Sequence, residues 1–243
     1  MSVDAAGNVY NTENMESGAD MDSSAVVFNL MVNTIDADAF LQTLYANGNF
    51  VWAKQLKGAD AYIDNIRVEV DASGYIYVSG VFVNVIDCDP SAAADNIAYT
   101  VFFDGFILKL DASGNFDWVK TFGAANEVVE LISLTLDNAN NIILGGNFSG
   151  SIDFDVSAST QILTAINSDG FVLKLDATGG FTYVKQLITN SYTTVSSIDI
   201  NATNNIYIGG LFFGTLDLDP STRISNVSSA NNSAALYFLK LSR

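Results

Sequence analysis

The sequence predicts an all-β protein assembled from four copies of one structural unit. A short turn between two apolar segments recurs at Asp4, Asp71, Asp137 and Asn201, so successive copies lie 67, 66 and 64 residues apart. Apolar residues alternate with others along the segments, which is the two-residue period of a β-strand. No sustained helical period interrupts this pattern. Repeats at such a spacing are typical of architectures in which each unit buries a face against its neighbour.

The first hairpin of each unit is predicted by its turn. The copies read V-D-A-A-G-N-V-Y from Val3, V-D-A-S-G-Y-I-Y from Val70, L-D-N-A-N-N-I-I from Leu136 and I-N-A-T-N-N-I-Y from Ile200. Asp or Asn at the first turn position caps a type I turn, and Gly or Asn at the fourth position takes the left-handed conformation that closes the hairpin. Two antiparallel strands therefore begin every unit.

A second hairpin completes the unit. Residues 105–120 read G-F-I-L-K-L-D-A-S-G-N-F-D-W-V-K, residues 170–185 match them, residues 39–54 match less closely, and the last copy stops at Leu241. In the first of these segments Phe106, Leu108 and Leu110 point to one side and Ile107 and Lys109 to the other, as strands require. Each unit is thus expected to hold four antiparallel strands.

Four antiparallel strands in about 65 residues are the content of one blade of a β-propeller. We expect a single propeller domain over residues 1–243, with repeats at 1–57, 64–123, 130–188 and 195–243, the last one incomplete. About fifteen strands are predicted, whereas a closed ring of four blades needs about sixteen. Two arrangements stay open: a four-bladed ring with one three-stranded blade, or an arc of a larger propeller.

Composition excludes several classes of function. The 243 residues include 10 Lys and Arg, 27 Asp and Glu, one Cys and no His, which gives a net charge of −17. Such a charge repels polyphosphate, so no nucleic-acid partner is expected. The absence of His removes the commonest general base and zinc ligand, and one Cys cannot form an intrachain disulfide. With 49% apolar residues the chain can build a core, which distinguishes it from a disordered acidic segment.

The run D-G-F-I-L-K-L-D-A-S-G-N-F-D-W-V-K-T-F at residues 104–122, with D-A-S-G-Y-I-Y-V-S-G-V-F at 71–82 and D-C-D-P at 87–90, resembles the SBBP-type β-propeller repeats of secreted and surface proteins of Bacteroidetes. The resemblance covers the whole chain in four copies. It implies an extracellular or cell-surface protein and brings no catalytic residues. The chain departs from the repeat at residues 29–36 and in the truncated last copy.

Membrane insertion and a signal peptide are not expected from the chain as given. No stretch reaches the ~18 consecutive apolar residues of a membrane helix. The first residues, M-S-V-D-A-A-G-N, contain neither a basic segment nor an apolar one. The abrupt end within a predicted strand makes a longer product worth considering.

A D-x-D-x-S motif recurs in every repeat and is the strongest candidate for a binding site. Its paired carboxylates are Asp20 and Asp22, Asp87 and Asp89, Asp153 and Asp155, and Asp217 and Asp219. In an extended segment the two carboxylates of a pair emerge on one face, where they could contribute to the 6–8 oxygen ligands of Ca²⁺. The alternative is a structural turn capped by Asp, which Pro90 and Pro220 favour. No other cofactor is indicated.

Four further repeat positions carry residues with chemistry of their own. Within the motif, Cys88 shares its slot with Met21, Phe154 and Leu218, so it is interpreted as a buried apolar side chain. The basic residues at two repeat positions either line a channel that binds an anionic glycan or pair with acidic neighbours on adjacent strands; they are Lys109, Lys174 and Lys240, and Lys54, Lys120 and Lys185. The aromatic position shared by Trp52, Trp118 and Tyr183 is predicted to be core between blades.

Together these features favour a non-enzymatic scaffold or adhesive module that binds a protein or a glycan at a cell surface. One alternative is a hydrolase or lyase of polysaccharide that uses carboxylates in the central channel. Its acid and base would come from acidic residues outside the repeat pattern, namely Glu13, Glu16, Glu69, Glu127 and Glu130, although a solvated loop is the simpler interpretation of the last two. Another alternative is a homo-oligomer or a subunit of a filament, appendage or phage particle, joined through exposed edge strands.

Overall fold

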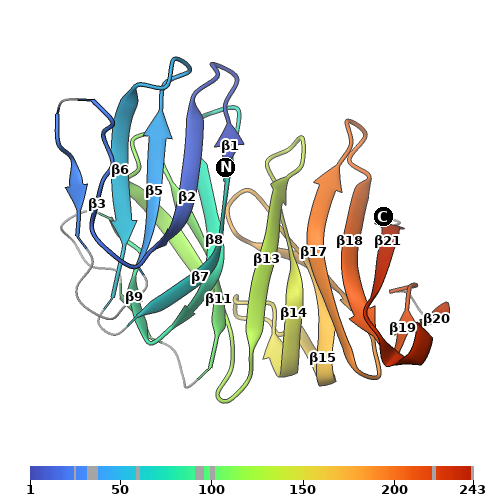
Figure 1. Cartoon of the computed structure of the whole chain (residues 1–243). Coiled ribbons are helices and arrows are strands. Elements are labelled where there is room, and N and C mark those ends of the chain that lie inside the picture. Colours follow the sequence, from blue (N-terminus) through green and yellow to red (C-terminus); the bar gives the residue numbers. More distant parts are fainter. Residues whose placement is uncertain are drawn as a thin grey trace. The chain divides into compact units, whose positions relative to one another are not determined.

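The computed structural model describes residues 1–24, 26–31, 38–58, 61–90, 96–98, 102–220 and 223–241. It is an all-β structure of several antiparallel sheets (Figure 1). Within the described residues the one helical segment is a short 3-10 turn, η1 (Ala230–Asn232), and no helix is long and apolar enough to cross a membrane. The chain divides into two compact units, Met1–Lys120 and Thr121–Arg243.

The first unit contains two four-stranded sheets. The first sheet runs in chain order through β1 (Ser2–Val3), β2 (Val9–Met15), β5 (Asp38–Leu44) and β6 (Phe50–Leu56). The second sheet runs in the same manner through β7 (Tyr62–Val70), β8 (Ile76–Val83), β11 (Asp104–Leu110) and β12 (Phe116–Phe122). In this unit each repeat of the sequence therefore contributes one four-stranded sheet.

The second unit repeats this plan with one strand fewer. Its first four strands are β13 (Val129–Leu136), β14 (Ile142–Asp153), β15 (Ile162–Leu175) and β16 (Phe181–Leu187). The next three are β17 (Tyr192–Ile200), β18 (Ile206–Phe213) and β21 (Ala235–Leu241). A single parallel bridge between Ser168 and Tyr192 joins the two groups into one seven-stranded sheet.

Small hairpins extend from the second and third strands of the repeats, and they carry the D-x-D motifs. They pair β3 (Ala19–Asp20) with β4 (Asn29–Leu30), β9 (Val85–Asp87) with β10 (Asn96–Ala98), and β19 (Thr215–Asp217) with β20 (Asn226–Ser228). In the third repeat the same hairpin is a continuation of β14 and β15, after a bulge near Gly150. The four motifs thus occupy equivalent places in the four repeats.

The predicted hairpin turns are confirmed by their hydrogen bonds. In the second repeat the Asp71 Oδ1 atom accepts the N–H groups of Ser73 and Tyr75, and Gly74 has a φ of 85°. The other turns place Gly or Asn at the same left-handed position, with φ of 83° at Gly7, 73° at Gly114, 60° at Asn140, 81° at Gly179 and 58° at Asn204. Hydrogen bonds from the backbone and side chain of Asn115 hold the pKa of Asp111 below its usual value. These turns are local devices, which is why the sequence predicts them correctly.

Within each unit the sheets share an apolar core. In the first unit Leu41 and Leu56 of the first sheet pack in one cluster with Val68, Phe82 and Phe106 of the second. The predicted aromatic core position is confirmed at Trp52, which packs against this cluster. Its ring lies so close to the β11–β12 turn that a Cβ on Gly114 would come within 3.0 Å of it. In the second unit Val172 packs in one cluster with residues of β17 and β18. Burial of such faces is the main stabilising term for stacked sheets.

Candidate functional site

The four D-x-D motifs cap hairpins, and the third copy shows how. The Asp153 Oδ1 atom accepts the N–H of Asp155 at 3.0 Å and that of Gln161, across the loop, at 2.8 Å. The Asp155 Oδ1 atom accepts the N–H of Ser157 at 3.0 Å. One carboxylate therefore ties the two ends of the loop together, and the second continues the turn.

The same network recurs where the other copies are described. Asp20 bonds the N–H groups of Asp22 and Phe28, and Asp217 bonds those of Asp219 and Ser225. In the second copy Asp87 bonds the N–H of Asp89 at 3.1 Å, whereas Ser91 and Ser221 of the motif lie outside the described residues. The recurrence shows that the first Asp of each motif has a structural role.

The middle residue of the motif anchors the hairpin in the core. Cys88 and Phe154 are fully buried, Met21 is buried, and Leu218 packs at the margin of the second unit's core. The prediction that Cys88 is an apolar core residue is confirmed, since its side chain is fully buried and belongs to the first unit's cluster. In each acidic loop, the apolar side chain between the two carboxylates therefore anchors the loop in the core.

The calcium prediction stays a prediction, and a melting experiment tests it. In the described part of the chain no three His, Cys, Asp or Glu side chains gather as a metal site, and the Oδ1 atoms of Asp153 and Asp155 already accept N–H donors. Two carboxylates supply few of the 6–8 oxygens that Ca²⁺ needs. A calcium site predicts that chelator lowers the melting temperature relative to millimolar Ca²⁺, whereas a loop that Asp only caps predicts the same melting temperature in both.

The matched control for this experiment is the double change Asp153→Asn with Asp155→Asn, which keeps an oxygen acceptor at each turn and removes both charges. It should melt identically in chelator and in Ca²⁺. A wild-type protein that melts several degrees higher in Ca²⁺, with the difference absent in the variant, would instead establish a calcium site in the third loop.

The first hairpin differs from the others in what it exposes. Val26 (69% exposed), Val27 (65%) and Met31 (67%) project into solvent, together with the less exposed Phe28. At the two positions of Val26 and Val27 the third hairpin has Ser159 and Thr160. An apolar loop tip of this kind is uncommon on a soluble surface unless it contacts something.

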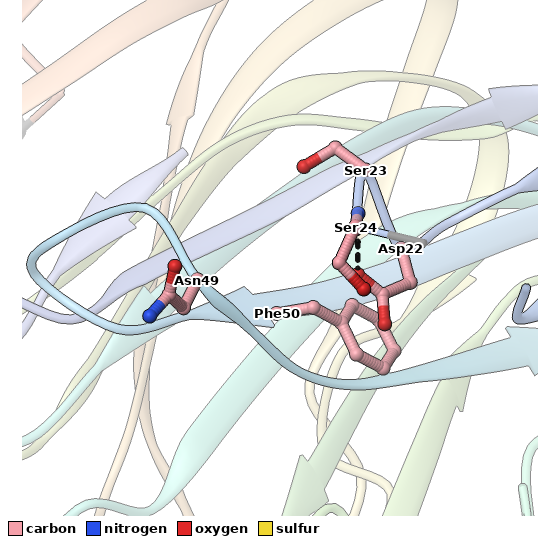
Figure 2. A pocket seen from close by; sticks show the side chains of 5 residues that line it. All are labelled: Asp22, Ser23, Ser24, Asn49 and Phe50. Carbon is pink, nitrogen blue, oxygen red and sulfur yellow. Dashed lines mark hydrogen bonds between the residues drawn. The ribbon is translucent and has the colours of Figure 1, made fainter. Parts of the chain in front are cut away.

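A pocket of about 460 Å³ opens at the base of this hairpin. It is lined by Asp22, Ser23 and Ser24 of the hairpin and by Asn49 and Phe50 at the start of β6 (Figure 2). The Ser24 N–H donates to the Asp22 carboxylate, shown as the dashed line in Figure 2. The centre of the Phe28 ring lies 5.1 Å from that of the Phe50 ring, so the hairpin packs against β6 through this aromatic contact. The pocket thus combines hydrogen-bonding groups with the aromatic ring of Phe50.

Repeated lysines contact acidic or aromatic neighbours. Lys174 Nζ lies 2.7 Å from the Asp137 carboxylate, and Lys109 Nζ lies 3.6 Å from that of Asp117. Predicted pairing with acidic neighbours is therefore confirmed at these two positions. Lys240 instead lies over the ring of Tyr207, 5.9 Å from its centre. Burial raises the pKa of Asp137, but the hydrogen bonds from Lys174 and its turn outweigh this effect and hold the pKa below its usual value.

The acidic residues considered for acid–base catalysis have other partners. Glu130 accepts a hydrogen bond from Asn147 at 2.8 Å, and Glu69 accepts one from Ser2 at 2.9 Å. The interpretation of Glu130 as a solvated loop residue is wrong, because it is partly buried in strand β13. Burial raises the pKa of Glu69, against the opposing effect of its hydrogen bond with Ser2.

Sequence reasoning missed a set of buried carboxylates that precede the apolar run of the third strand in three repeats. Asp38 and Asp169 accept hydrogen bonds from Gln55 and Gln186 of the adjacent fourth strand, at 2.5 Å and 2.6 Å. Asp104 occupies the equivalent position, but its Oδ1 atom is buried without a partner, and burial raises its pKa to about 6. The signal was present in the repeat, since Asp recurs before the apolar run and Gln recurs after the lysine of the fourth strand.

Comparison with known proteins gives one distant relative of note. The sequence matches no protein-family model. The chain is similar to a WD repeat-containing protein. This relative is an uncharacterized protein of Acanthamoeba polyphaga mimivirus, 23% identical over 216 aligned positions, which include 78% of this chain. The chain spans only 15% of that relative's length. The likeness therefore concerns one segment of that relative.

Proposed function

We propose that this chain is part of a β-propeller that binds another protein and acts as a scaffold rather than as an enzyme. Three observations support the propeller: repeats of four antiparallel strands in chain order, sheets that share a core within each unit, and the similarity to a WD repeat-containing protein. The resemblance to SBBP-type repeats supports an extracellular or cell-surface setting for this scaffold.

The scaffold role is supported by how the polar motifs are used. The paired carboxylates recur from repeat to repeat and cap their hairpins in the same way at Asp20, Asp153 and Asp217. Their oxygens accept backbone N–H groups, which stabilises loops. An active site is normally built once, from groups whose environments differ from those of their counterparts.

The single observation that carries protein binding is the first hairpin. Its exposed apolar side chains are those of Val26, Val27 and Met31. The same hairpin contributes Asp22 and Ser24 to a pocket that Asn49 also lines. Protein interfaces combine an apolar centre with a rim of hydrogen-bonding groups, and this loop offers both. The equivalent hairpins lack the same run of apolar residues. We therefore assign the partner-binding surface to the first hairpin.

Site-specific photo-crosslinking tests this assignment. A photoreactive amino acid is placed at position 27 or, as the matched control, at position 224, which is the same position of the fourth hairpin and is also exposed. Extract of the cells that make the protein is then irradiated with each variant. We expect a discrete protein adduct from position 27 only, lost in the presence of excess unlabelled wild type and retained with excess Val26→Ser/Val27→Ser protein.

Equal adducts from both positions, or none from position 27, would contradict the assignment. The enzyme alternative is tested in parallel by incubating the purified chain with acidic and neutral polysaccharides. Release of oligosaccharide that Glu130→Gln abolishes would defeat the scaffold proposal itself.

A further inference from the structure

Another pocket, of about 220 Å³, opens inside the second unit between the third and fourth repeats. Three segments line it: the outer part of β15, strand β16 with the residue after it, and the acidic hairpin that begins with β19. The lining residues are Leu163, then Val184, Lys185, Gln186 and Ile188, and then Asp217, Asp219 and Pro220. All of them belong to one unit, so contacts within that unit shape the pocket.

Hydrogen bonds between the two repeats hold the walls of this pocket in place. The Asp217 N–H donates to the Ile188 carbonyl at 3.0 Å, which joins the acidic hairpin to the segment after β16. On the other side the Gln186 side chain donates to the Thr164 carbonyl at 3.0 Å. Because the lining groups are already positioned, a ligand would need to order little of the protein, which favours binding.

Opposite charges line this pocket. The Asp217 Oδ1 atom accepts the N–H groups of Asp219 and Ser225, whereas no described group donates to its Oδ2 atom. Among the described residues Asp217 forms no ion pair, so a cation from outside can compensate its partly buried charge. Lys185, whose Nζ atom lies 5.9 Å from the centre of the Tyr183 ring, brings a positive charge to the same pocket.

The rest of the lining restricts the ligand further. Four of the lining side chains are apolar, and they are Leu163, Val184, Ile188 and Pro220. The pocket volume of about 220 Å³ is below the ~300–1,000 Å³ that is usual for drug-sized ligands. A fitting ligand is therefore small and carries an ammonium group, an anionic group and an apolar group close together.

We infer that this pocket binds an α-amino acid with an aliphatic side chain. The ammonium group of the ligand contacts the carboxylates of Asp217 and Asp219, and its carboxylate contacts the Lys185 ammonium group. Its side chain packs against the apolar lining. Each charge of the ligand then meets an opposite charge of the protein in a partly buried site, where such contacts are strongest. The inference goes beyond the scaffold role and depends on no partner of the first hairpin.

The first unit provides a comparison for one lining residue. There the Asp87 N–H donates to the Lys57 carbonyl, as the Asp217 N–H does to Ile188, so Lys57 holds the place of Ile188. A lysine at this place brings an ammonium group of the protein itself to the acidic motif, where it competes with that of a ligand. We therefore expect each chain to bind one amino acid, between its third and fourth repeats.

Isothermal titration of the full chain with L-leucine tests the inference. We expect saturable binding of one leucine per chain. N-acetyl-leucine lacks the ammonium group, leucinamide lacks the carboxylate and glycine lacks the side chain, so each should bind more weakly by about tenfold or more. Leucinamide also represents the N-terminus of a peptide, which distinguishes a free amino acid from a peptide end as the source of the ammonium group.

Matched variants locate the site. Ile188→Lys copies the residue of the first unit at a side chain that is 57% exposed, and it should weaken leucine binding by about tenfold or more. Lys185→Gln should weaken binding to a similar extent, whereas Lys54→Gln, at the equivalent position of the first repeat, should leave it unchanged. Absence of saturable binding, equal binding of leucinamide or N-acetyl-leucine, or leucine binding that survives both Ile188→Lys and Lys185→Gln would overturn the inference.

Discussion

Phe154→Ala lowers the free energy of unfolding of the second unit by about 4 kcal/mol, the cost of emptying a buried aromatic site. The Phe154 ring is fully buried, and its centre lies 4.8 Å from that of Phe171, 5.3 Å from that of Phe148 and 6.3 Å from that of Phe122. Removal of the ring leaves a cavity at the centre of this cluster. Because Phe154 stands between Asp153 and Asp155, the substitution should also loosen the third acidic hairpin.

Calorimetry and urea denaturation followed by circular dichroism measure this loss. Both tryptophans, Trp52 and Trp118, belong to the first unit, so their fluorescence reports that unit separately and should show an unchanged transition if the units unfold independently. Val156→Ala in the same hairpin is the control, because Val156 is partly exposed and should cost within about 0.5 kcal/mol. If Phe154→Ala lowered the free energy of unfolding by less than about 1 kcal/mol, the conclusion that the middle residue of the motif anchors the hairpin in the core would be refuted.

Asp169→Ala and Asp104→Asn should change stability in opposite directions. The buried Asp169 carboxylate accepts the Thr189 N–H at 2.9 Å and the Gln186 side chain at 2.6 Å. The Thr189 hydroxyl in turn contacts the carbonyl groups of Phe213 and Thr215, which links the two groups of strands in the second unit. Asp169→Ala leaves a buried N–H without an acceptor, so we expect a loss of about 3 kcal/mol.

Asp104 lacks this support because the equivalent of Gln186 in its repeat is Thr121. Burial raises the pKa of Asp104 to about 6, above the ordinary value for an aspartate. The stability that the protonated group contributes is therefore complete below about pH 4 and is lost as the pH rises through about 6. Relative to Asp104→Asn, the wild type should lose about 2 kcal/mol between about pH 4 and pH 8.

Denaturation followed by tryptophan fluorescence at several pH values measures this difference in the first unit. A second variant, Thr121→Gln, supplies the missing partner and should lower the pKa of Asp104, which stabilises the protein near pH 8 without removing the carboxylate. If the wild type and Asp104→Asn kept a constant difference in stability at every pH, the carboxylate would be ionised throughout and the assignment would fail.

Much of the fold could be predicted from the sequence because its determinants are local and repeated. Asp71, Gly74 and their counterparts specify turns through hydrogen bonds that span only a few residues. The middle position of the D-x-D motif could be predicted as core because four apolar residues share it. That the Asp153 carboxylate accepts N–H groups from both ends of the loop could not be predicted from the motif, because Gln161 lies eight residues away.

The sequence by itself determined the β class, the hairpin turns and the recurrence of each motif, since a side chain and a backbone group a few residues apart meet whatever surrounds them. The tertiary structure alone decided which equivalent positions are unequal. Asp169 has hydrogen-bonding partners, whereas the Oδ1 atom of Asp104 has none among the described residues. This difference arises from contacts between segments distant in the chain, so it depends on which side chain the neighbouring strand supplies.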